Sequence, residues 1–272
     1  MTQPKRRPAP AKAPGTRDRA GRTEFSMPVP SHRPRKTAML LAQRIVDEIV
    51  DEGLPPGTPM LSEAEMLKKY QVARGTLRET LRYLEMQGVI TIKTGPGGGA
   101  VVADPGSQPL ASVIALLLQL SKTSYRSIVD ARLVLEPVLA RMAATRRTEG
   151  DLETLAETIE DMKENIDNGR RFLEQNTVFH MTIAEAAGNP VLFHMVSSLS
   201  WIEDGTALGI EYARETHRPI ISAHRRIYAA IEAGDPDMAE AAMRLHVGAF
   251  AKYAEENYGR VLDHPLRWDQ VN

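Results

Sequence analysis

The stretch from residue 62 to residue 102, SEAEMLKKYQVARGTLRETLRYLEMQGVITIKTGPGGGAVV, constrains the fold more than any other part of the chain. Ser62 and Glu65 have the spacing of a capping box, which marks the first turn of a helix. Residues 71–73 are predicted to form a turn, and a second helix then runs to Gly88, a residue type common at helix ends. Two short helices joined by a tight turn are therefore expected here.

A glycine-tipped hairpin is expected directly after the second helix. Short apolar segments predict strands over residues 89–93 and 100–103, and the glycine-rich segment 95–99 lies between them. A further helix is predicted over residues 37–53 from the helical spacing of its apolar side chains. The order helix, helix, turn, helix, hairpin over residues 37–103 is that of a winged helix-turn-helix.

The second helix of this motif carries two stripes on different faces. Residues four apart advance about 400° around a helix and so share one slowly drifting face. The positive stripe consists of Arg74, Arg78 and Arg82. The apolar stripe consists of Leu77, Leu81 and Leu84. Such a helix packs on a core while it offers cations to phosphates and guanines, which points to DNA.

Charge is distributed unevenly, although the formal net charge is −1. Residues 1–36 carry a net charge of +8, residues 37–102 carry −1, and the remainder carries −8. The first 36 residues are rich in Pro, Arg and Lys with few large apolar side chains, which predicts a disordered basic tail. A basic N-terminal part followed by an acidic remainder suits a DNA-binding N-terminal part and a second domain with another task.

The composition sets further limits on the class of protein. A chain of 272 residues has room for two domains. No apolar run approaches the about 18 residues that a membrane helix needs, so no membrane partner is expected. The absence of cysteine excludes disulfides and thiolate metal sites, and it fits a cytoplasmic protein.

Everything after a proline-containing linker over residues 104–108 is predicted to be helical. The predicted helices span approximately residues 109–122, 124–144, 148–168, 172–187, 190–212, 216–233 and 235–258. We therefore expect a mostly α protein in which an all-α antiparallel bundle of six or seven helices, over residues 109–258, follows the winged helix-turn-helix. Residues 259–272 are predicted to be a C-terminal tail.

Several segments resemble a known family. Residues 72–102, VARGTLRETLRYLEMQGVITIKTGPGGGAVV, closely resemble the DNA-binding signature of the GntR family of bacterial transcription regulators. ARLVLEPVLARMAA (131–144), NTVFHMTIAEAAGN (176–189) and AHRRIYAAIEAGD (223–235) are similar to segments of its FadR-type subgroup, whose effector-binding part is the FCD domain. The resemblance covers roughly residues 37–258 and implies a transcription regulator, usually a repressor.

The resemblance also implies which residues contact DNA. They are Arg74, Gly75, Thr76, Arg78 and Arg82 and, in the wing, Gly97 and Gly98. Arg74 and Arg78 are expected to reach the major groove or its flanking phosphates, and the helix start offers backbone N–H groups to a phosphate. Arg82 lies farther along the helix, where pairing with a neighbouring glutamate is the alternative.

One DNA contact of the family is altered in this chain. The position that usually holds a backbone-contacting arginine is Ala64, so that phosphate contact is either missing or supplied by Lys68 or Lys69. Proteins of this kind usually bind palindromic double-stranded DNA as two-fold dimers, and we expect a homodimer here.

A metal site is expected in the helical domain. By resemblance its ligands are Asn176, His180, His224 and His246. Asn176 precedes His180 by four residues, so both project from one helix face, and imidazole is a common ligand of divalent ions such as Zn²⁺ or Ni²⁺. The family usually has an aspartate at position 176, and an amide oxygen is a weaker donor without charge. The other histidines are expected to be structural or exposed: His32, His194, His217 and His264.

Arg132 is the candidate effector-binding residue. From its spacing alone, Arg132 is expected to form an i,i+4 surface ion pair with Glu136. The resemblance instead directs Arg132 into the bundle, where a guanidinium binds a carboxylate bidentately. A metal and an arginine together favour a small organic acid, such as a hydroxy, keto or sugar acid, as the effector.

Three alternatives remain open at this stage. The metal ion itself is the signal in the first, and a larger acyl ligand binds without any metal in the second. The third is a helical-bundle metalloenzyme whose histidines activate water. Against an enzyme, the chain lacks the Glu-x-x-His pair of di-iron bundles and shows no evident general base beside the histidines. We therefore predict a regulator and not an enzyme.

Overall fold

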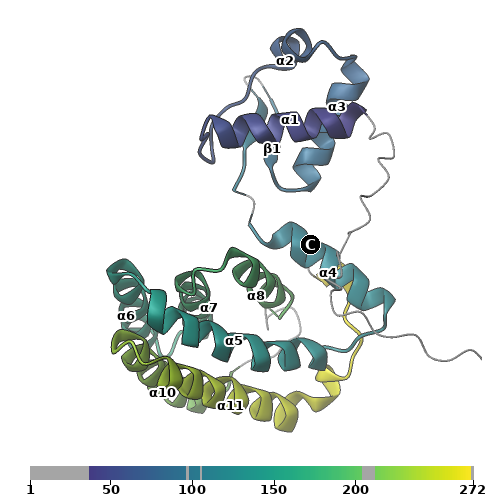
Figure 1. Ribbon diagram of the computed structural model, residues 1–272. Coiled ribbons are helices and arrows are strands. Elements are labelled where there is room, and N and C mark those ends of the chain that lie inside the picture. The colour runs from purple at the N-terminus through teal and green to yellow at the C-terminus, as the bar shows by residue number, and fades with distance from the viewer. Residues whose placement is uncertain (1–36, 96–97, 105, 204–211, 271–272) are drawn as a thin grey trace, which may run out of the picture. The chain divides into compact units, whose positions relative to one another are not determined.

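The computed structural model describes residues 37–95, 98–104, 106–203 and 212–270 (Figure 1). The expected basic tail over residues 1–36 lies outside the described residues, as does Gly97. The winged helix-turn-helix and the helical domain are described separately below. Among the described residues, no helix has both the length and the apolar character that crossing a bilayer requires.

The N-terminal domain is the expected winged helix-turn-helix. Its elements are α1 (Thr37–Asp51), α2 (Glu63–Tyr70), α3 (Arg74–Met86), β1 (Ile90–Lys93) and β2 (Gly99–Val102). The capping box is present, because the Ser62 hydroxyl accepts from the Glu65 amide and the Glu65 carboxylate accepts from the Ser62 amide at 2.9 Å. Gln71 ends α2 in the left-handed conformation, with a φ of 54°, and this turns the chain sharply into α3.

The hairpin is antiparallel, with Ile90 opposite Val102 and Lys93 opposite Gly99. Its tip requires glycine at position 98, since a Cβ there would lie 2.3 Å from the Lys93 carbonyl oxygen. The outer edge of β2 is paired with the chain before α2, a contact that the sequence did not indicate. Backbone hydrogen bonds join Gly57 and Thr58 to Val102 and Met60 to Ala100. This edge is therefore covered, which gives the short hairpin a firm base.

The C-terminal domain contains only helices among its described residues. They are α4 (Gln108–Leu120), α5 (Arg126–Arg146), α6 (Glu149–Glu164), α7 (Gly169–Ala186), α8 (Pro190–Glu203), α10 (Arg214–Glu232), α11 (Pro236–Leu262) and a 3₁₀ turn, η1 (Trp268–Gln270). Thr148 caps α6 and Asp235 caps α11 through their side chains, as polar residues before a helix commonly do. The seven α-helices agree with the expected bundle.

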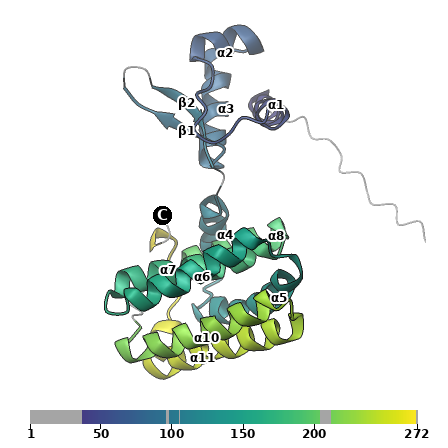
Figure 2. The same ribbon diagram turned by 90° about the vertical axis from the view of Figure 1, so that its left-hand side faces the viewer.

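Helix α5 is the centre of this bundle. It packs against α7, α8, α10 and α11, while α6 packs on α7 and α10 (Figures 1 and 2). The main core lies between these helices and includes the fully buried rings of Phe172 and Phe179. A second core joins α4 to the beginning of α5 and to the end of α11. A side chain on the inner face of α5 therefore meets three or four helices at once.

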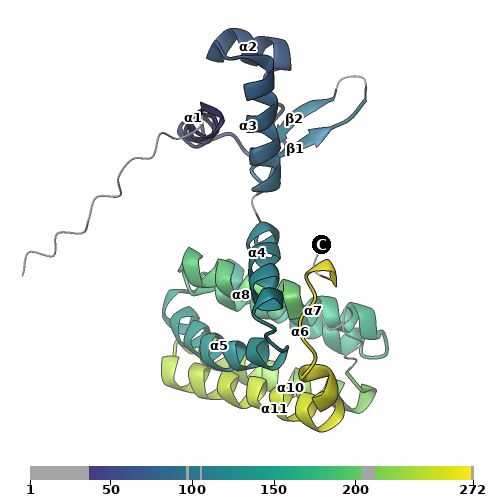
Figure 3. The same ribbon diagram turned by 90° about the vertical axis from the view of Figure 1, so that its right-hand side faces the viewer.

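Two helix ends differ from the sequence prediction. The helix expected from Pro190 to about Tyr212 is present as α8 up to Glu203, its part over residues 204–211 lies outside the described residues, and Tyr212 is not helical. Helix α11 continues past the expected end at Tyr258, where the backbone is locally non-helical, and stops at Leu262. Residues after position 258 also fold back instead of forming a free tail: Leu266 is buried, and its amide donates to the Thr123 carbonyl at 3.1 Å (Figure 3).

The returning C-terminal segment is expected to stabilise the helical domain. Leu266→Ala should reduce the free energy of unfolding by about 2–5 kcal/mol, because it empties a fully buried site against α4 and α11. Urea unfolding followed by circular dichroism measures this change. Met238→Ala, at an exposed site on α11, is the control and should change stability by no more than about 0.5 kcal/mol. Equal effects of the two changes would contradict the packing role of Leu266.

Candidate functional site

Helix α3 presents its arginines to solvent and its leucines to the core. Leu77 and Leu84 are fully buried, whereas the side chains of Arg74 and Arg78 are 71% and 66% exposed. Arg82 is also exposed and forms no ion pair within the described part of the chain. The two stripes expected from the sequence therefore lie on separate faces of one helix.

Glu63 on α2 forms ion pairs with both Arg74 and Arg78. One of its carboxylate oxygens lies 3.3 Å from Nε of Arg74 and 3.4 Å from Nε of Arg78. The sequence analysis did not assign Glu63 a role, although its place in the first turn of α2 puts it beside the start of α3. Each of these exposed guanidinium groups offers two N–H donors, a pattern that matches the paired O6 and N7 acceptors on the edge of a guanine.

The other expected DNA-contacting residues lie near this pair or at the wing. Gly75 has open space around it, and the start of α3 has no side-chain cap, so its first backbone N–H groups remain available to a phosphate. Gly98 shapes the wing tip. Of the two lysines expected to replace the arginine missing at position 64, Lys69 binds Glu48 at 2.9 Å. Lys68 is exposed and has no ion pair among the described residues.

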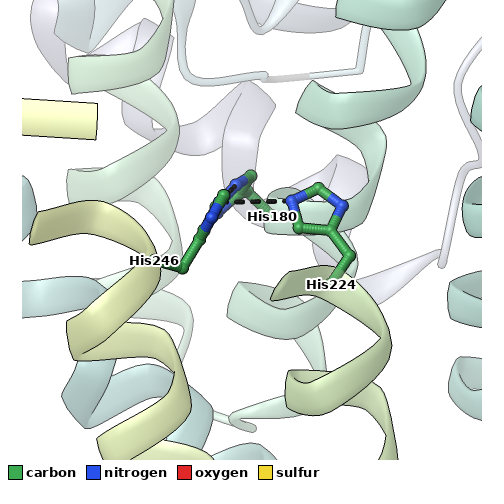
Figure 4. A group of neighbouring side chains, drawn as sticks. All are labelled: His180, His224 and His246. Atoms are coloured by element: carbon green, nitrogen blue, oxygen red, sulfur yellow. Dashed lines mark hydrogen bonds between the residues drawn. The ribbon is translucent and has the colours of Figure 1, made fainter. Parts of the chain in front are cut away.

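Three histidines meet in the helical domain: His180 from α7, His224 from α10 and His246 from α11 (Figure 4). We call them the histidine cluster. The Nε2 atom of His246 lies 3.1 Å from that of His180 and 3.2 Å from that of His224. All three rings offer a nitrogen within a group no wider than 4.8 Å. The sequence placed these residues on three helices, and the structure brings them together.

A buried carboxylate stands behind this cluster. Glu136 on α5, 3% exposed, lies 2.6 Å from Nδ1 of His180 through one oxygen and binds Arg132 through the other. Nδ1 of His180 therefore faces Glu136, while Nε2 of the same ring faces His246. Carboxylates behind a histidine often orient metal-binding imidazoles in this way. The sequence analysis treated Glu136 only as a partner of Arg132.

The surroundings favour neutral side chains for His224 and His246 and an ionised side chain for Glu136. Burial alone would raise the pKa of Glu136, but Arg132 and His180 outweigh it and hold that pKa well below its usual range. Burial, followed by the neighbouring His246 and His180, lowers the pKa of His224 far below its ordinary value. Burial and the charge of His180 lower the pKa of His246 to about 3. Neutral imidazole is the form that binds a metal ion.

This donor set fits a divalent metal ion. Zinc–nitrogen bonds of 2.0–2.1 Å in a tetrahedron imply nitrogen–nitrogen separations of about 3.3 Å, close to the two measured values. His224 stacks on Phe179 and its buried Nδ1 has no hydrogen-bond partner among the described residues. Asn176, the fourth expected ligand, is half-buried one turn before His180.

The remaining described histidines have other contacts. His217 stacks on Phe172, and its Nδ1 lies 2.7 Å from the Ile166 carbonyl. His194 pairs with the Ser107 hydroxyl at 3.1 Å, and His264 is exposed. These placements agree with the expected structural or surface roles. His32 lies outside the described residues.

A cavity of about 280 Å³ lies between α10 and α11 and reaches the histidine cluster through His246. Its other lining residues are Tyr212, Glu215, Thr216, Pro219, Ile220, Ala223, Arg226, Leu245, Ala249, Phe250 and Tyr253. Arg132, expected to bind an effector there, does not line it. Arg132 instead holds Glu136 and lies over the ring of Phe250, so the carboxylate that it binds belongs to the protein itself. Arg226, which the sequence analysis did not single out, is the arginine of the cavity wall.

A winged helix-turn-helix with a paired-arginine helix, followed by a helical domain with a polar centre and a cavity, points to the class of DNA-binding regulators. Comparison with protein families agrees. Residues 38–102 match the bacterial regulatory proteins of the gntR family, and residues 127–249 match the FCD domain. The chain belongs to the GntR family, in its FadR-type subgroup with an FCD domain.

Its relatives are transcription regulators. The chain is 30% identical to the HTH-type transcriptional regulator LutR of Bacillus subtilis over 75% of its own length and 96% of that protein. It is 26% identical to the HTH-type transcriptional repressor NanR of Escherichia coli over 77% of its length and 84% of that protein. A solved GntR structure from Streptococcus agalactiae shares the fold, with a TM-score of 0.61 at 22% identity, over 79% of this chain and 99% of that one. The chain is therefore a DNA-binding transcriptional regulator and not an enzyme.

The paired arginines give a direct test of the DNA interface. Arg78→Ala should weaken binding to an operator selected from random-sequence duplexes by about 1–3 kcal/mol, provided that Arg78 reads a base bidentately. Fluorescence anisotropy at a fixed salt concentration measures this loss. Arg170→Ala, at an exposed arginine of the helical domain that pairs only with Glu174 at the surface, is the control. Unchanged affinity of the Arg78 variant would remove this residue from the interface.

Proposed function

We propose that this chain is a one-component repressor whose operator affinity is controlled by a small carboxylate bound beside a divalent metal ion in the helical domain. The observation that carries the proposal is the histidine cluster: three imidazoles converge next to Glu136, and His246 also lines a cavity. A coupling free energy of about 1–3 kcal/mol between the two domains changes DNA affinity roughly 5- to 150-fold. Acting on a bacterial chromosome, such a regulator works in the cytoplasm.

In this proposal His180, His224 and His246 hold the ion, with Asn176 as the candidate oxygen ligand one turn away. A bound Zn²⁺ or Ni²⁺ ion supplies a Lewis-acid position that attracts an anionic ligand. Glu136 fixes the orientation of the His180 ring, and Arg132 fixes Glu136. Arg132 thus stabilises the effector site through Glu136 and does not bind the effector directly.

A homodimer is supported by helix α4, which is apolar on two faces. Ala111 and Ala115 are fully buried within the domain. A second stripe, at a spacing of three and four residues, remains exposed and consists of Leu110, Val113, Leu117 and Leu120. Leucine and valine in a continuous exposed stripe favour association with another apolar surface. A second copy of α4 offers the same stripe, and two-fold pairing would match a palindromic operator.

A metal sensor is the second candidate function, because the histidine cluster is built entirely from the chain's own buried side chains. In that case the ion alone changes operator affinity, and the cavity has no regulatory ligand. The larger acyl ligand considered from the sequence would instead fill the cavity without a metal.

The proposed function predicts that DNA binding depends on both metal and acid. Elemental analysis of the purified protein should find about one equivalent of a divalent transition metal, and His224→Ala should lose most of it because one buried ligand is removed. Operator affinity, measured by anisotropy with a panel of small carboxylates, should change roughly 5- to 150-fold for at least one acid. His264→Ala, at an exposed histidine, is the control.

The outcomes separate the candidates. If affinity responds to a chelator but to no acid, the metal sensor is correct. If an acid acts equally on metal-free and metal-loaded protein, the metal is not part of the effector site. If neither acid nor metal changes operator affinity, the proposed control mechanism is wrong.

The exposed stripe of α4 predicts the oligomeric state. Size-exclusion chromatography with light scattering should give twice the chain mass of 30.1 kDa for the unmodified protein. Leu117→Glu should shift it to the mass of a single chain, because a charge at a side chain 57% exposed in the protomer would become buried at the interface. Met238→Glu, on the exposed start of α11, should remain dimeric. A dimeric Leu117→Glu protein would exclude this face.

A further inference from the structure

The cavity has two chemically different ends. Arg226, Leu245 and His246 lie at one end, and Tyr212, Glu215 and Tyr253 lie at the other. Glu215 and Arg226 are eleven residues apart on α10, which separates them by about 16 Å along the helix axis. The Tyr253 hydroxyl accepts a hydrogen bond from the Ala213 amide at 3.1 Å, so the N-terminal end of α10 is fixed against α11.

At the first end of the cavity, Arg226 is the cation that is available to bind a ligand. Its Nη1 donates to the Ser222 hydroxyl at 3.0 Å, and it forms no ion pair with any residue that the structure describes. Arg132 is already held by Glu136, and the neighbouring Arg225 approaches Glu160 at 4.0 Å on another face of α10. Arg226 also lies close enough to His246 for its charge to act on that ring. A carboxylate at this end would therefore meet a guanidinium next to the histidine cluster.

The wall between the two ends is mostly apolar. Its middle is formed by Pro219, Ile220, Ala223, Ala249 and Phe250. The ring of Tyr212 lies 5.8 Å from that of Phe250 and is stacked at 6.2 Å on that of Tyr253, so the far end is aromatic. A volume of about 280 Å³ is slightly below the roughly 300–1,000 Å³ of sites for drug-sized ligands and suits a smaller molecule.

We propose that Arg226 binds the carboxylate of the effector, and that the cavity selects a monocarboxylate with an aliphatic or aromatic body. The apolar wall stabilises such a body by removing it from water, whereas the hydroxyl groups of a sugar acid would lose their hydrogen bonds to water there. Glu215 at the far end repels a second carboxylate and so disfavours dicarboxylates. This inference rests on the proposed function, since it assumes that an acid acts at this site.

Isothermal titration calorimetry of the full chain with five probes tests the inference: acetate, hexanoate, phenylacetate, succinate and gluconate. Hexanoate and phenylacetate should bind most tightly, with affinity rising up to about fourfold for each added methylene group. Hexanamide, which lacks the charge, should bind more weakly than hexanoate. Each titration is run with and without a chelator, so that a carboxylate bound by the metal is distinguished from one bound by Arg226.

Arg226→Gln should weaken hexanoate binding by about tenfold to a hundredfold, because it removes one charge-assisted hydrogen-bond donor. Arg226→Lys should retain part of the affinity. Arg225→Gln changes the adjacent exposed arginine, which does not line the cavity, and should bind hexanoate as the unmodified chain does. Operator binding without any acid should be the same in the Arg225→Gln variant as in the unmodified chain.

The two proposals fail in different ways. If acids bind and change operator affinity but Arg226→Gln has no effect, or if gluconate or succinate binds best, this inference is overturned and the proposed function stands. If none of the five probes binds at millimolar concentration, this inference is also overturned. If hexanoate binds through Arg226 but leaves operator affinity unchanged, the ligand assignment holds and the proposed function is wrong.

Discussion

The buried contact among Arg132, Glu136 and His180 is the interaction on which the helical domain depends. An ionised carboxylate that is 3% exposed is costly unless both of its oxygens are matched, and here one binds a guanidinium and the other an imidazole. Loss of either partner would leave a buried charge uncompensated. The central helix α5 is therefore tied to α7 by a polar contact as well as by apolar packing, and the positions of both helices are set together.

This arrangement explains how a ligand can act on the whole domain. The histidine cluster connects α7, α10 and α11, so an ion bound there would be held by three helices and linked through Glu136 to a fourth, α5. Close-packed helices move as units, and a small change in the separation of the rings is transmitted along them. Helix α4, which carries the exposed apolar stripe through which we propose dimerisation, packs on α8 in the same bundle.

Much of this could be predicted from the sequence. The capping box at Ser62 and the arginine and leucine stripes depend on neighbouring residues, and the structure confirms them. Contacts that depend on how the helices pack together were harder to predict. Arg132 and Glu136 have the same spacing whether they lie at the surface or in the core, so spacing alone favoured a surface pair. Arg226 is one of many arginines until α10 and α11 are packed together, and residues 259–272 showed no sign of folding back on α4.

DNA recognition by this chain cannot depend on bulk charge, because residues 37–102 carry a net charge of −1. In the proposed interface it depends on the direction of Arg74 and Arg78, both of which pair with Glu63. Since Glu63 partly neutralises both arginines, we expect nonspecific attraction to phosphate to be weak and affinity to arise mainly when two recognition helices of a dimer meet matching half-sites together. A regulator of this design is sensitive to the spacing and orientation within a dimer. That geometry is what a ligand-dependent change in the helical domain would alter.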